Sequence, residues 1–163
     1  MKTLVSFLFL KEVNVPICPW NQTAHAGCVF FLLGKFHILQ DACITAAGNQ
    51  ALQAGDVVAT PGYQLNCREV YHAMITKYDA SVGAVLLLTN VIQSCLSKAD
   101  SSGYSSIAFP TLGAGGFSYP ADLVMKTFQA VVNGFEAKNL RTVNLVVYST
   151  DQTALAVSFY DIC

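Results

Sequence analysis

The glycine-rich segment between Pro110 and Pro120 is the part of the chain best suited to chemistry. Its centre reads Gly113-Ala114-Gly115-Gly116-Phe117. Glycines let backbone N–H groups approach a phosphate closely, and the N-terminal end of a following helix favours anions. An apolar strand is expected at 105–109 and a helix from residue 119, so the context is strand, glycine loop, helix. The pattern predicts an anion site; a plain glycine turn that needs positive φ is the alternative.

Two well-known phosphate motifs do not fit this segment. No Gly-Lys-Ser or Gly-Lys-Thr follows the glycines, which excludes a P-loop. The third glycine position of a dinucleotide-binding fingerprint is occupied by Ser118, and Pro110 interrupts the approach to the loop. Ligands of open α/β sheets lie beyond the carboxyl ends of strands, where this loop is expected.

Strands and helices alternate along the rest of the chain, which indicates the α/β class. Strands are expected at 3–10, 28–33, 56–60, 69–75, 105–109 and 142–148, and helices at 38–47, 82–99, 119–137 and 151–160. The first strand is expected at an edge of the sheet, and Gly48 is expected to end the first helix. Several strands are apolar throughout, which predicts a mainly parallel sheet between two helical layers.

The composition points to one folded domain. The chain has 163 residues, of which 53% are hydrophobic and only 12% charged. Such a chain can bury a sizeable core, which excludes disorder as its main state. The formal net charge is −1, which argues against a broad surface for nucleic acid or an anionic membrane. The low charge leaves room for an apolar contact with a neighbouring domain or subunit.

The N-terminus imitates a secretory signal, with Ala24-His25-Ala26 as an apparent cleavage site. However, Lys11 and Glu12 end the apolar run too far before that site, so we expect a strand and a cytoplasmic or nuclear protein. The run is also too short to span a bilayer. The cysteines include no closely spaced pair, so we expect free thiols and no metal site. They are Cys18, Cys28, Cys43, Cys67, Cys95 and Cys163.

Several ordered blocks resemble the macrodomain family, in wording closest to the macrodomains of multi-macrodomain ADP-ribosyltransferases. The blocks are Ala42–Gly48, Gly55–Leu65, Val70–His72, Ile107–Pro120 and Asn144–Ser149. The resemblance implies a three-layer α/β/α fold with a mixed, mainly parallel central sheet. It implies a single macrodomain over residues 1–163, with 1–27 as a divergent N-terminal strand and loop. The implied ligand is ADP-ribose or an ADP-ribosylated protein, with no cofactor.

The resemblance also assigns site residues. Backbone amides of Gly113, Ala114, Gly115 and Gly116 would bind the diphosphate, and the Phe117 ring would cover the distal ribose. Tyr148 would lie against adenine, with Ser149 as a nearby polar contact. Core packing is the alternative for Phe117 and Tyr148. His72, on an apolar strand, is interpreted as a core histidine rather than a catalytic base.

The departures from the family pattern bear on catalysis. Leu32–Lys35 stands where the family has Asn-Ala-Ala-Asn, and Gln40 falls on the aspartate of hydrolytic members. The early Gly-Asp-Ile is missing. Hydrolysis needs a group that positions and activates water, and glutamine cannot act as a base. The sequence therefore predicts a binding module without catalysis. The alternatives are a degenerate macrodomain that serves protein interaction, and an ADP-ribosyl hydrolase that uses another group.

Overall fold

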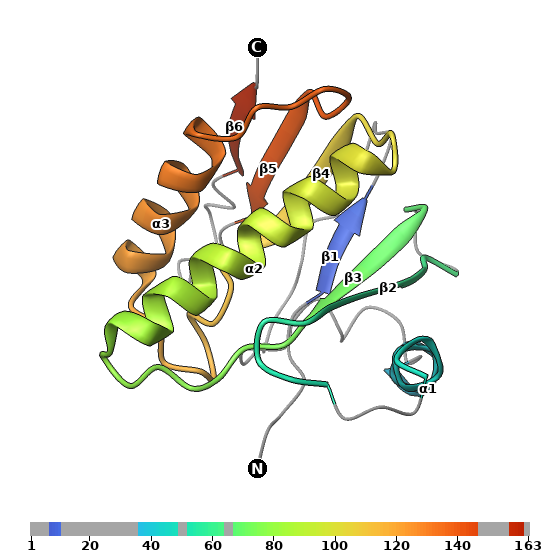
Figure 1. The fold of residues 1–163 in the computed structure, drawn as a ribbon, viewed down its shortest axis with the longest axis horizontal. Helices are drawn as coiled ribbons and strands as arrows, with labels where there is room; N and C mark the ends of the chain where they lie inside the picture. The colour runs from blue at the N-terminus through green and yellow to red at the C-terminus, as the bar shows by residue number, and fades with distance from the viewer. Residues whose placement is uncertain (1–6, 11–35, 49–51, 64–66, 147–156, 162–163) are drawn as a thin grey trace, which may run out of the picture.

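A computed structural model describes residues 7–10, 36–48, 52–63, 67–146 and 157–161 (Figure 1). The helices are α1 (Phe36–Ala46), α2 (Val82–Ser101) and α3 (Ala121–Asn133). The strands are β1 (Phe7–Leu10), β2 (Val57–Pro61), β3 (Glu69–Ala73), β4 (Ser106–Pro110), β5 (Thr142–Val146) and β6 (Val157–Asp161). Within the described part, the alternation predicted from the sequence is confirmed for 38–146. The strand expected at 28–33 lies outside the described residues.

The six strands form one mixed sheet in the order β2-β3-β1-β4-β5-β6. Only β4 and β5 pair in parallel; the other neighbouring pairs of the described strands are antiparallel. The expectation of a mainly parallel sheet is therefore wrong for this part of the chain. Apolar strands signal burial on both faces, and antiparallel strands share this property when helices cover both faces. Since β1 runs opposite to both neighbours, β3 and β4 end at the same edge of the sheet.

Two expectations about single elements are also corrected. Strand β1 lies between β3 and β4 rather than at an edge. Its sequence, Phe-Leu-Phe-Leu, is apolar at every position, which suits a strand with neighbours on both sides. The helix expected at 151–160 is replaced at its end by β6, whose residues pair with β5 from Val157 to Asp161. Tertiary pairing has overridden the local preference there.

Helices α2 and α3 cover one face of the sheet (Figure 1). Residues of the strands that face them, such as Tyr71, Phe109 and Leu145, belong to one buried apolar core. Along β2, Val57 and Ala59 pack against that core, whereas Thr60 points to the opposite face and lines a hollow beside α1. Helix α1 therefore lies on the other face, which gives the expected three layers.

Helix α2 is the central core helix. The Ser81 hydroxyl caps its N-terminus by accepting the N–H of Ala84 at 3.1 Å. The expected inward residues Leu88, Leu96 and Ala99 are buried, while Val85 is half-buried. Among the described residues, α2 alone is long and apolar enough to cross a membrane by composition. Its packing against the sheet and α3 accounts for that apolar character, because the core helix of a globular domain meets the same criterion.

The carboxylate of Asp100 joins the end of α2 to the turn before β5. Its Oδ1 accepts the N–H groups of Lys138, Asn139 and Leu140 at 2.9, 2.7 and 2.8 Å. The Asn139 side-chain amide donates to the Asp100 carbonyl at 2.9 Å. Hydrogen bonds from these backbone groups, that of Leu140 first, lower the pKa of Asp100. One carboxylate thus fixes the point at which β5 enters the sheet.

The interpretation of His72 as a core histidine is confirmed. The ring is fully buried, and its Nε2 lies 2.8 Å from the Thr60 hydroxyl on β2. Burial lowers the pKa of His72 to about 4, so the ring is neutral at pH 7. Cys43 and Cys95 are buried free thiols, as expected, and Cys67 is free but only half-buried. Cys18, Cys28 and Cys163 lie outside the described residues.

Candidate functional site

The glycine segment forms a loop between β4 and α3, in the strand–loop–helix context that the sequence predicts. Gly115 and Gly116 are exposed, while Gly113, Ala114 and Phe117 are half-buried. The loop lies at the carboxyl end of β4, on the same edge as the segment 74–81 that follows β3. This is the edge at which open α/β sheets bind ligands.

Three carbonyl groups of the loop accept hydrogen bonds from backbone N–H groups of the protein. The Tyr119 N–H donates to the Gly113 carbonyl at 3.0 Å, and the Ser118 N–H donates to the Gly115 carbonyl at 2.9 Å. From outside the loop, the Tyr78 N–H donates to the Phe117 carbonyl at 2.8 Å. Three carbonyl oxygens are thereby held by donors within the protein.

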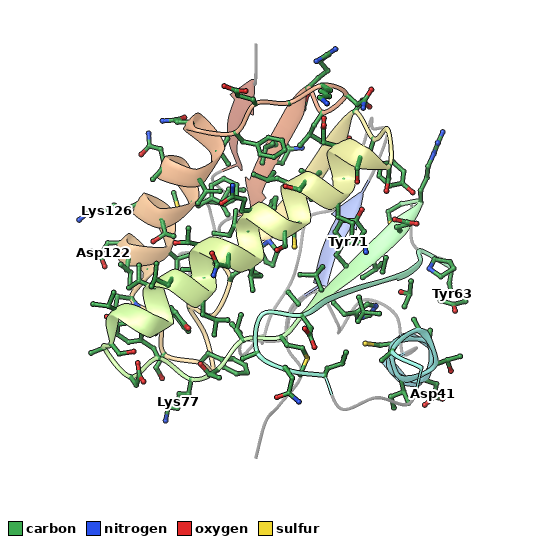
Figure 2. All side chains as sticks on the ribbon, in the orientation of Figure 1. Asp41, Tyr63, Tyr71, Lys77, Asp122 and Lys126 are labelled. Atoms are coloured by element: carbon green, nitrogen blue, oxygen red, sulfur yellow. The ribbon has the colours of Figure 1, made fainter. Side chains whose placement is uncertain are left out.

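Four of the five N–H donors of the loop have no acceptor among the described residues. The N–H groups of Gly113, Gly115, Gly116 and Phe117 donate to no residue that the structure describes. Successive backbone N–H groups with no partner form an anion-binding concavity. The charged side chains of segments 74–81 and 111–120 are Lys77 and Asp79, one of each sign. Lys77 lies at the lower edge of the molecule in Figure 2. Anion binding here would therefore depend on backbone donors rather than on a cluster of cations.

Glycine is required at Gly113 by both conformation and packing. Its φ is +77°, and a Cβ atom would lie 2.6 Å from Tyr119 Cδ2 and 3.1 Å from Ile75 Cδ1. At Gly116, by contrast, a Cβ atom would meet nothing within 4 Å. Ser118 adopts φ +60°, so a serine supplies the left-handed residue for which a fingerprint would use glycine.

Aromatic side chains support the loop from below. Tyr119 is 2% exposed, and its hydroxyl donates to the Ala84 carbonyl at 3.4 Å. Burial is the main cause that raises the pKa of Tyr119. The Tyr78 and Tyr119 rings lie 5.1 Å apart at 46°. Phe117 packs against the core while remaining half-buried, so part of the residue stays accessible to solvent.

Sequence reasoning missed Tyr78. The signal was present, since Asp79 and Ser81 precede a long apolar run and so mark a turn that starts a helix. Such a turn lies beyond the carboxyl end of a strand, beside the glycine loop. In the structure the Asp79 carboxylate accepts the Ser81 N–H at 3.0 Å, and the hydrogen bonds from Ser81 lower the pKa of Asp79.

The other predicted site residues lie outside the description. Tyr148 and Ser149 fall in 147–156, and Leu32–Lys35 falls in 11–35. Gln40 lies within α1. A hollow of about 520 Å³ between α1 and β2 is lined by Asp41, Thr60 and Tyr63. It lies at the opposite end of β2 from the glycine loop, and Figure 2 shows Asp41 and Tyr63 on that side, far from Lys77. It is therefore distinct from the loop site.

Comparison with known proteins identifies the family. The Macro domain family model matches residues 37–128, more than half of the chain. The chain belongs to the macrodomain family. The resemblance noted in the sequence is thereby confirmed, and with it the α/β/α fold.

Individual relatives span this macrodomain to different extents. An uncharacterized protein of Pyrococcus furiosus is 33% identical in an alignment of 145 positions that covers 78% of each chain. Human protein mono-ADP-ribosyltransferase PARP14 is 26% identical over 118 residues, 69% of this chain and 7% of that protein. A protein-ADP-ribose hydrolase of Treponema medium is 32% identical over 105 residues, 62% of this chain and 40% of that protein.

A solved structure agrees with the fold. A mutant of the Oceanobacillus iheyensis macrodomain with ADPR superposes with a TM-score of 0.61 and 23% identity. The match covers 71% of this chain and 63% of the solved chain, so this chain spans less than two thirds of that macrodomain. At this identity the likeness concerns the fold alone.

Proposed function

We propose that this macrodomain binds ADP-ribose, free or attached to a protein, through the backbone amides of Gly113, Gly115, Gly116 and Phe117. One observation carries the proposal: three carbonyl groups of the loop accept hydrogen bonds within the protein, and four of its N–H groups have no acceptor among the described residues. A diphosphate has the charge and the oxygen acceptors that such donors bind. The Oceanobacillus iheyensis macrodomain, which has the same fold, was solved with ADPR, and this supports the choice of ligand.

The family resemblance also assigns the other contacts with ADP-ribose. Ala114 lines the diphosphate cradle, although its own N–H donates to the Thr111 carbonyl at 3.2 Å. The half-buried Phe117 covers the distal ribose. The family resemblance assigns the Tyr148 ring to adenine and Ser149 to a nearby polar contact, and both residues lie outside the described part of the chain.

The proposed role is that of a reader without hydrolytic activity. Gln40, at the position of the hydrolytic aspartate, cannot activate water. Asp79 follows Tyr78, the residue that contacts the loop. Its carboxylate accepts the Ser81 N–H and thereby stabilises the turn before α2. The buried free thiols Cys43 and Cys95 support a reducing compartment, the cytoplasm or the nucleus.

Hydrolysis is the second candidate because the Treponema medium relative is a protein-ADP-ribose hydrolase. A release assay on a mono-ADP-ribosylated protein separates the two. If the protein only binds ADP-ribose, the assay should detect no release of ADP-ribose above the uncatalysed background. Turnover by the purified protein would contradict the proposal that it lacks hydrolytic activity. If that turnover were lost in Gln40→Ala, the catalytic group would lie at that position.

Isothermal titration tests binding. ADP-ribose and ADP should bind saturably, and adenosine should bind more weakly because it lacks phosphates. Gly115→Glu should abolish binding, since it adds bulk and negative charge to the cradle. Gln129→Glu is the matched control, because it adds the same charge at an exposed position of α3. Absence of heat and of a thermal shift at millimolar ADP-ribose would contradict the proposal and favour a protein-interaction domain.

A further inference from the structure

One residue of the segment 74–81, which follows β3, contacts the glycine loop in two ways. The N–H of Tyr78 donates to the Phe117 carbonyl at 2.8 Å. The ring of Tyr78 lies 5.1 Å from the ring of Tyr119. Tyr78 thus joins the segment after β3 to both Phe117 and Tyr119.

The ring that Tyr78 contacts is the support of the loop. Tyr119 lies directly beneath Gly113, since a Cβ atom there would be 2.6 Å from Tyr119 Cδ2. Its N–H closes the loop on the Gly113 carbonyl, and its hydroxyl is bonded to Ala84 in the first turn of α2. A displacement of the Tyr119 ring would therefore move Gly113 and the amides that follow it.

The main-chain contact acts on the electrostatics of the loop. A carbonyl that lacks a donor can turn its negative end toward a bound anion, which weakens binding. The hydrogen bond from Tyr78 holds the Phe117 carbonyl within the protein instead. A loop that is already ordered also avoids the entropy cost of ordering on binding.

We propose that Tyr78 is a positioning residue that preorganises the Gly113–Phe117 loop for the diphosphate, without itself contacting the ligand. The inference rests on the proposed function for its effect on affinity. It also makes a claim about the free protein, namely that Tyr78 keeps the loop ordered. The ring matters for this role, whereas the Tyr78 hydroxyl does not.

Four variants separate positioning from general stability. Tyr78→Ala removes the ring, Tyr78→Leu keeps apolar volume in case the alanine variant does not fold, and Tyr78→Phe restores the ring. Tyr104→Ala is the matched control. Tyr104 is also half-buried and packed against the core, but it precedes β4 at the opposite edge of the sheet. ADP-ribose affinity is measured by titration well below the melting temperature.

We expect Tyr78→Ala to weaken ADP-ribose binding at least tenfold, Tyr78→Leu to weaken it less, and Tyr78→Phe to stay within twofold of wild type. Tyr104→Ala should lower the melting temperature and leave the affinity unchanged. Wild-type affinity in both Tyr78→Ala and Tyr78→Leu would overturn the proposal. So would a loss in Tyr78→Phe equal to that in Tyr78→Ala, because the hydroxyl would then contact the ligand.

Hydrogen exchange in the ligand-free protein provides the readout that does not depend on the proposed function. The N–H groups of Ser118 and Tyr119 donate within the loop and should exchange faster in Tyr78→Ala than in Tyr104→Ala. Faster exchange in a protein that binds no ADP-ribose would refute the proposed function and retain the ordering role. Unchanged exchange would refute the ordering role itself.

Discussion

Replacing Gly113 with alanine tests whether packing beneath the loop fixes its conformation. At φ +77° an alanine costs about 1 kcal/mol relative to glycine. The new Cβ would also lie 2.6 Å from the Tyr119 ring and 3.1 Å from Ile75 Cδ1. Both neighbours are buried, and crowding of this kind costs about 2 kcal/mol. The free energy of unfolding should therefore fall by about 3 kcal/mol in Gly113→Ala.

Gly103→Ala isolates the packing part of that loss. Gly103 has nearly the same backbone angle, φ +76°, but a Cβ atom there would meet nothing within 4 Å. Its variant should lose only about 1 kcal/mol. Urea unfolding measures both values, and the melting temperature should fall by about 3 °C for each kcal/mol in a chain of this length. Equal destabilisation of the two variants would refute the claim that packing against Tyr119 fixes the loop at Gly113.

Two further predictions concern pH. Because the pKa of His72 is lowered to about 4 from its ordinary 6.5, protons favour the unfolded chain below pH 6.5. The free energy of unfolding should fall by about 2 kcal/mol from pH 7.5 to 5. Urea unfolding of His72→Gln should lack that part of the loss. An equal pH dependence in the wild type and in His72→Gln would exclude a neutral buried ring. Asp100→Ala should cost about 3 kcal/mol, because three backbone N–H groups lose a charged acceptor. Since the pKa of Asp100 is lowered from 3.8, its contribution is complete above that value and is lost as the pH falls through the lower folded pKa. A loss below about 1 kcal/mol in Asp100→Ala at neutral pH would contradict this anchoring role.

The helices and the glycine loop could be predicted because their signals are local. Pro120 and Asp122 mark the start of α3, and Gly48, at φ +63°, follows the end of α1. The loop was predicted from its glycines and its position between a strand and a helix. The burial of His72 followed from the apolar residues beside it in the strand.

Strand direction could not be predicted in the same way. The apolar runs in β1 and β3 signal burial, but they carry no information on which neighbour each strand pairs with or in which direction. The same holds for β6, where pairing with β5 decides the conformation of Val157–Asp161. The role of Tyr78 depends on two segments that are distant in sequence, with Phe117 nearly forty residues away. No spacing rule connects such residues, and only the shared edge of β3 and β4 brings them together.

The most direct test of the account follows the loop amides by NMR during titration with ADP-ribose. The N–H signals of Gly115, Gly116 and Phe117 should shift progressively to saturation, because these donors gain a phosphate acceptor. The same titration of Gly115→Glu should leave the spectrum unchanged. Saturable shifts confined to other residues, such as Asp41 in α1 and Tyr63 after β2, would contradict the assignment of the site. A spectrum without shifts would contradict ADP-ribose binding.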